Sequence, residues 1–146
     1  MWKAVRPRPL RITKHKRMGE LKAMKLEPTK ETPEVTLDTE GNKFEISGRS
    51  FPLNAKGFYL PILEWLDGYA DNPNAKTEFI FKLEYFNTPS SKSISDILKK
   101  MKEIKDNGND VTVYWYYEED DIDILDLGHV FARTVGMDFE FKEYID

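Results

Sequence analysis

The 146-residue sequence contains no cysteine, and it lacks the short motifs that mark several common classes of enzyme. Without cysteine the chain can form no disulfide, no thiolate metal site and no cysteine nucleophile. No apolar run approaches the length of about 18 residues that a membrane-spanning helix needs. A phosphate-binding glycine loop, GxSxG and HExxH are also missing. We therefore expect no catalytic constellation of these kinds, and we expect a cytoplasmic protein.

Histidine is scarce, and charge is distributed unevenly along the chain. The two histidines, His15 and His129, are distant in sequence, which argues against a transition-metal site. Residues 1–17 carry seven Lys and Arg and no acid, whereas the rest carries 15 basic and 26 acidic residues, a net charge of −11. We expect a basic, flexible N-terminal arm over residues 1–25 and a single domain over residues 26–146.

The basic arm raises the alternative of nucleic-acid binding. Its basic residues are not interleaved with the aromatic residues on which bases stack. The acidic body would also repel a phosphate backbone. We therefore favour an arm without this role, and we expect neither nucleic acid nor a membrane as a partner.

Regular alternation and helical spacing predict the secondary structure. Apolar residues that alternate on both sides of Gly41-Asn42 predict a β-hairpin. Apolar residues at helical spacing predict helices within residues 48–74, 92–106 and 121–135. The segments KTEFIFKLEYF, VTVYWYY and FEFKEYI predict strands between and after them. Strands and helices alternate after residue 50, which predicts the α/β class, with a single mixed β-sheet packed with helices.

Two of these elements carry more detailed expectations. Pro61 lies inside the first helical pattern, so that helix either begins near Leu60 or is kinked at the proline. The strand KTEFIFKLEYF places Ile80 on one face and four apolar or aromatic residues on the other, which indicates that both faces of the sheet are at least partly covered. Those four residues are Phe79, Phe81, Leu83 and Tyr85.

The junction between this strand and the next helix concentrates residues that cap helices or accept phosphate. Pro89 favours the first helical position, so Thr88 is predicted as the N-cap. Ser90 and Ser91 would then present free backbone N–H groups, a favourable site for a phosphate on Thr88, and Lys92 could add a contact. Helix capping alone would also explain these residues.

The acidic segment EEDDIDILD, from Glu118 to Asp126, offers hard oxygen ligands for Mg²⁺ or Ca²⁺. It lacks the glycine and the terminal glutamate of a calcium loop, and acidic residues are favoured at a helix start in any case. We interpret the segment as a solvated, helix-capping or docking surface. The alternative is a small Mg-dependent hydrolase that uses this cluster.

Five motifs follow one another along the chain: TPEV, ISGRSFPLNA, FYLPILEWL, EYFNTPSSK and VYWYYEEDDIDILDLG. Together and in this order, they resemble the SiaC family of bacterial regulatory phosphoproteins. The resemblance runs from about Thr32 to Tyr144. It implies a STAS-like fold, like that of anti-sigma-factor antagonists, and a protein that is not an enzyme and needs no cofactor. The implied partners are a Ser/Thr kinase, a PP2C-type phosphatase and a diguanylate cyclase, hence control of cyclic-di-GMP and biofilm formation.

The family's phosphothreonine motif falls on residues 87–92, so the resemblance assigns the phosphate acceptor to Thr88. Pro89 departs from the serine that is more usual there. We expect a partner-binding surface around this junction, and no catalytic or metal-binding residue. Its expected members are Asn87, Ser90, Ser91 and Lys92, followed by Phe51, Asn54 and Tyr59 from the shared motifs, for which core packing and loop hydrogen bonding are the alternatives.

Overall fold

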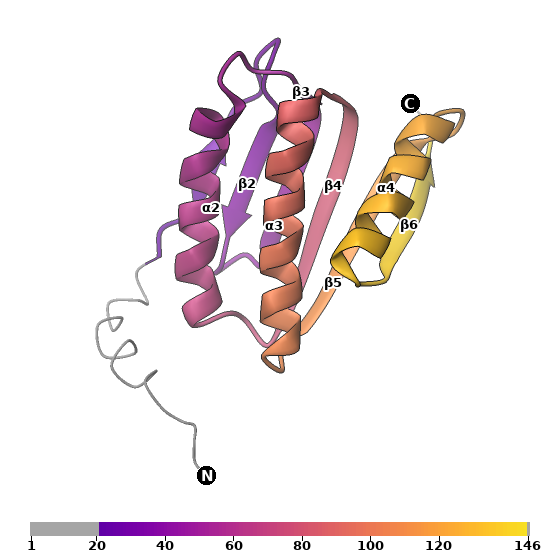
Figure 1. Ribbon diagram of the computed structural model, residues 1–146. Coiled ribbons are helices and arrows are strands. Elements are labelled where there is room, and N and C mark those ends of the chain that lie inside the picture. Colours follow the sequence, from indigo (N-terminus) through magenta and orange to yellow (C-terminus); the bar gives the residue numbers. More distant parts are fainter. Residues whose placement is uncertain (1–20, 146) are drawn as a thin grey trace.

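The computed structural model describes residues 21–145. Within them, six strands form one sheet in sequence order, and three helices pack on it (Figure 1). The expected α/β class with a single mixed sheet is confirmed. The elements are β1 (Met24–Leu26), β2 (Glu34–Asp38), β3 (Lys43–Ser50), α2 (Ala55–Asp71), β4 (Lys76–Phe86), α3 (Thr88–Asp106), β5 (Asp110–Glu118), α4 (Ile122–Val135) and β6 (Phe139–Tyr144).

The connections between strands determine where the helices lie. Strands β1, β2 and β3 are antiparallel, and the predicted turn of the β2–β3 hairpin holds Asn42 at φ 52°. Strands β3 to β6 are parallel, and each successive pair is joined by one helix. Right-handed crossovers that always advance in the same direction put their helices on the same face. Figure 1 shows α2, α3 and α4 on that one face, so within residues 21–145 no helix covers the other face, where Ile80 is only partly buried.

The core lies between the sheet and the three helices. The predicted apolar stripe of α3 is confirmed, since Ile94, Ile97, Leu98, Met101 and Ile104 are all buried. Helix α4 packs around the indole of Trp115, whose Nε1 donates to the carbonyl of Ile124 at 2.9 Å. Its ring also contacts four phenylalanines, namely Phe81, Phe86, Phe131 and Phe139.

Helix α2 begins at Ala55, five residues before the start near Leu60 that the position of Pro61 indicated. The side chain of Asn54 accepts a hydrogen bond from the backbone N–H of Gly57 at 3.0 Å and caps the helix there. The expected start near Leu60 is therefore wrong. Both Gly57 and Pro61 are exposed, so water can bond the carbonyl that the proline leaves without a donor.

A β-bulge changes the pattern at the end of β4. Gly48 pairs with Leu83, but the next residue of β3, Arg49, pairs with Tyr85, so Glu84 is the extra residue. The insertion reverses the alternation, and the side chain of Tyr85 is 45% exposed while Phe86 is buried. The expectation that Tyr85 shares the buried face of Leu83 is wrong for this reason.

The first described residues belong to the packed structure. The carbonyl of Lys22 accepts a hydrogen bond from Trp65 Nε1 at 2.7 Å, and Met24 and Lys25 pair with β2. The sheet thus extends to the N-terminal side of the boundary expected at residue 26. Residues 1–20, which hold most of the predicted arm and His15, lie outside the described residues.

Candidate functional site

The candidate site lies at the edge of the sheet where the parallel strands end. Strands β3, β4 and β5 end at Ser50, Phe86 and Glu118, and a helix begins shortly after each of them. This is the upper edge in Figure 1, and all three helix N-termini meet it. In α/β sheets this edge is the usual place for a functional site, because it gathers loops and helix N-termini.

Asn87, and not Thr88, caps helix α3. Its Oδ1 accepts a hydrogen bond from the N–H of Ser90 at 3.0 Å, and its carbonyl accepts one from the N–H of Ser91 at 2.9 Å. Thr88 is the first residue of the helix and is exposed. The predicted N-cap is therefore one residue too late, and the expected free amides of Ser90 and Ser91 are already bonded.

Three buried hydroxyls hold this helix start against β3 and α2. Ser50 Oγ donates to Ser90 Oγ at 2.8 Å and lies 2.7 Å from the hydroxyl of Tyr59. Ser50 has only one proton, so Tyr59 must donate to it. Burial, partly offset by this hydrogen bond, raises the pKa of Tyr59 to about 12. The Asn87 N–H also donates to the carbonyl of Ser50 at 3.1 Å, so the start of α3 is held to the end of β3 through both backbone and side chain.

The residues expected at the partner surface divide into two groups. Thr88, Lys92 and Asn54 are exposed, and Asn87, Ser91 and Phe51 are partly exposed. Ser90 and Tyr59 are completely buried in the network just described. Burial leaves their side chains no surface for a partner, so they position the site from beneath, as the alternative of core packing allowed for Tyr59.

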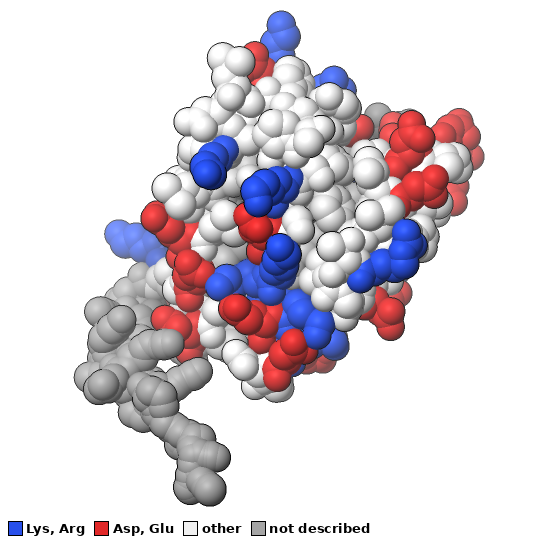
Figure 2. Space-filling model, in the orientation of Figure 1, with Lys and Arg blue, Asp and Glu red and all other residues white. Residues whose placement is uncertain are grey.

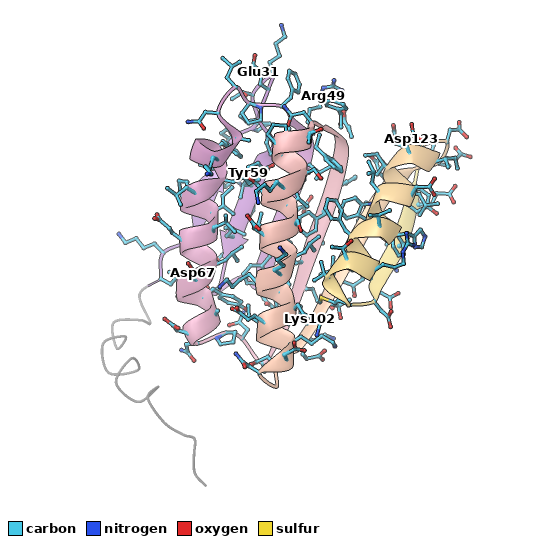
Figure 3. All side chains as sticks on the ribbon, viewed as in Figure 1. Glu31, Arg49, Tyr59, Asp67, Lys102 and Asp123 are labelled. Carbon is cyan, nitrogen blue, oxygen red and sulfur yellow. The ribbon has the colours of Figure 1, made fainter. Side chains whose placement is uncertain are left out.

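A cluster that the sequence did not predict lies beside the junction. The guanidinium carbon of Arg49 is 5.6 Å from the ring centroid of Phe51 and 5.5 Å from that of Tyr85, and the two rings meet edge to face at 6.0 Å. We call these three residues the Arg49 cluster. Figure 3 shows Arg49 at the upper edge of the molecule. Phe51 was expected at the site from a shared motif, but the bulge at Glu84 that turns Tyr85 outward left no signal in the sequence.

The acidic segment forms a surface at the start of α4, where Figure 2 shows clustered Asp and Glu. Asp121 caps the helix by accepting from the N–H of Ile124 at 3.1 Å. Within residues 21–145, no three His, Cys, Asp or Glu side chains are arranged to hold a metal ion. His129 instead stacks on Phe141, with ring centroids 4.0 Å apart. The bond of Asp121 fits the capping interpretation of this segment.

The helices of the described region are all too short or too polar to cross a membrane.

The family of the protein follows from comparison with known proteins. The model of the SiaC family, described as SiaC family regulatory phosphoprotein, matches residues 26–144. The chain therefore belongs to this family, and it is a regulator and not an enzyme. An uncharacterized protein of Pseudomonas aeruginosa strain UCBPP-PA14 is 23% identical over 116 residues, which are 80% of this chain and 92% of that protein.

Two solved structures from Pseudomonas aeruginosa share the fold. The crystal structure of apo-SiaC has a TM-score of 0.72 and 24% identity, covering 83% of this chain and 97% of its own. A chain from the crystal structure of the diguanylate cyclase SiaD in complex with its activator SiaC has a TM-score of 0.76 and 22% identity, covering 83% of this chain and 99% of its own. At these identities the likeness establishes the fold.

Proposed function

We propose that the protein is a phospho-switched interaction module with Thr88 as its phosphoacceptor. The observation that carries this proposal is the exposed hydroxyl of Thr88 on the first residue of a helix that is rigidly held from beneath. An acceptor must be open to a kinase, and a regulatory phosphate acts only if its position relative to a partner is fixed. The exposure of Thr88 and the hydrogen bonds of the helix start support these two conditions.

The proposed partners are a Ser/Thr kinase, a PP2C-type phosphatase and a diguanylate cyclase, all in the cytoplasm. Support for the cyclase comes from the solved relative, where SiaC is described as the activator of the diguanylate cyclase SiaD. By this proposal the protein controls cyclic-di-GMP and biofilm formation. Family membership as a regulatory phosphoprotein supports the kinase and phosphatase.

The bare form is the one that binds the cyclase in this proposal. Phosphorylation adds between about −1.5 and −2 charges at an exposed position, next to a surface shaped for a neutral hydroxyl. The partly or fully exposed residues of the junction, Asn87, Ser91 and Lys92, would contact the cyclase directly, and Asn54 and Phe51 would extend that surface. Ser90 and Tyr59 would hold the surface in shape.

The experiment that tests the acceptor is phosphorylation by the kinase of the same bacterium, followed by mass spectrometric mapping. We expect one phosphate, on Thr88, and none on the Thr88→Ala variant. Ser91→Ala is the matched control, because Ser91 lies on the same helical turn and keeps Thr88 intact. Phosphate on Ser91 or elsewhere, with Thr88 unmodified, would disprove the assignment.

A further inference from the structure

The Arg49 cluster carries a positive charge that has no ion-pair partner among the described residues. Within residues 21–145 Arg49 forms no ion pair, although the domain has a large excess of acidic residues. Its side chain is exposed and is held over the rings of Phe51 and Tyr85. Cation–π contacts of this kind fix the guanidinium plane, while its N–H donors stay available for a carboxylate or a phosphate.

The residue types of the Arg49 cluster are those of binding hot spots, because arginine and tyrosine are enriched at such centres. Leu53, two residues after Phe51 in the sequence, is fully exposed. An exposed leucine close in sequence to a stacked arginine favours a partner segment that carries an acidic and an apolar side chain. The charge of Arg49 determines the sign of the partner group, because only an anion can pair with it.

The backbone links the cluster to the proposed phosphoacceptor. Arg49 precedes Ser50, whose carbonyl accepts from the N–H of Asn87, and Asn87 precedes Thr88. Asn87 already occupies the amides of Ser90 and Ser91, so these two helix donors are not free to bind a phosphate on Thr88. A phosphate on Thr88 would therefore pair with a cationic side chain that has no other partner. A guanidinium can bind it through two parallel hydrogen bonds.

We propose that Arg49 binds a carboxylate of the cyclase when Thr88 is not phosphorylated. A phosphate on Thr88 binds Arg49 instead and displaces that carboxylate. This inference rests on the proposed function and names the groups through which the cyclase would bind and be released. The partner segment is acidic with an apolar neighbour, the receptor is the Arg49 cluster with Leu53, and release follows from competition between two anions for one guanidinium.

The first test measures binding of the bare protein to the diguanylate cyclase of the same bacterium by calorimetry. Arg49→Gln should raise Kd by about tenfold or more, as expected for a lost charge-assisted pair, and Arg49→Lys should fall between it and the wild type. Arg133→Gln is the matched control, because Arg133 is also exposed but lies in the last turn of α4, at the far edge of the sheet; its Kd should stay within about twofold. Wild-type binding by Arg49→Gln would overturn the carboxylate contact.

The second test measures the pKa of the Thr88 phosphate by phosphorus NMR in the phosphorylated protein. Arg49 should lower this pKa, so Arg49→Gln should raise it by about half a pH unit or more, while Arg133→Gln leaves it unchanged. An unchanged pKa in Arg49→Gln would overturn the competition, and a rise in Lys92→Gln would then assign the phosphate contact to Lys92. Failure of the proposed function is distinct: the wild type would then bind the cyclase equally well with and without the phosphate.

Discussion

At the scale of single residues, the site depends on side chains that hold one helix start in place. Asn87 and Ser90 fix the first turn of α3. Ser50 accepts a hydrogen bond from Tyr59 of α2 and donates one to Ser90 of α3, so it connects the two helices. A second tyrosine of α2 makes a matching buried contact at the other end of that helix, where Tyr69 lies 2.7 Å from Thr77 Oγ1. The same substitution, tyrosine to phenylalanine, can therefore be made at the site in Tyr59 and away from it in Tyr69 as the control.

Stability should fall at alkaline pH because of Tyr59. Its pKa is about 12 in the folded protein, above the ordinary tyrosine value of 10.0, so the unfolded chain loses this proton first. The contribution is complete below pH 10.0 and is lost as the pH rises toward 12, by up to about 2–3 kcal/mol. Denaturant melts between pH 9 and pH 12 should show this fall in the wild type and in Tyr69→Phe. Tyr59→Phe should lack it, and an equal fall there would assign it to other groups.

The cap of α3 gives a second prediction. Asn87→Ala should lower the free energy of unfolding by about 1 kcal/mol, because the N–H of Ser90 loses its acceptor. Thr88→Ala should change it by less than about 0.5 kcal/mol, since Thr88 is exposed and is not the cap. Urea unfolding compares the two directly. If Thr88→Ala lowered the free energy of unfolding more than Asn87→Ala, Thr88 and not Asn87 would be the N-cap.

At the scale of elements, α4 approaches the sheet through a glycine. A Cβ on Gly128 would lie 2.5 Å from two atoms of the Trp115 indole, and that ring is held by its bond to Ile124. Gly128→Ala should therefore lower the free energy of unfolding by about 1–3 kcal/mol. Gly68→Ala, in the exposed face of α2, meets only a flexible leucine at 3.4 Å and should raise stability by up to about 1 kcal/mol. Chemical unfolding that shows the two variants equally stable would contradict this packing.

The sequence predicts most elements because their apolar residues repeat regularly. The stripe of α3 and the β2–β3 hairpin follow from spacing and turn residues alone. The wrong predictions arise where a single residue changes the local structure that the spacing of apolar residues indicates. Glu84 inserts a bulge that turns Tyr85 outward, Asn54 starts α2 ahead of Pro61, and Asn87 rather than Thr88 caps α3. The Arg49 cluster depends on that bulge, so periodicity could not reveal it.

At the scale of the whole molecule, a one-sided sheet separates a packed helical layer from an open face. The open face carries lysines over tyrosine rings, as where Lys82 Nζ lies 4.5 Å from the ring centroid of Tyr144. The Thr88 junction lies at the edge between the two layers, where strands end and helices begin. A partner can therefore reach Thr88 and the Arg49 cluster without disturbing the core.

Deletion of residues 1–17 should leave this domain intact. The basic segment has no apolar face to bury, and the described packing includes the contact between Lys22 and Trp65. We expect the free energy of unfolding to change by less than about 0.5 kcal/mol and cyclase binding to be retained. Thermal melts and calorimetry of the shortened chain check both. Unfolding or loss of binding would show that the segment belongs to the fold or to the interface.

The central claim is that the charge state of Thr88 switches cyclase activation. Its most direct test measures cyclic-di-GMP formation by the diguanylate cyclase of the same bacterium, titrated with the bare protein and with protein fully phosphorylated on Thr88. The bare protein should activate the cyclase, and the phosphorylated protein should fail to do so at equal concentration. Equal activation by both forms would contradict the account.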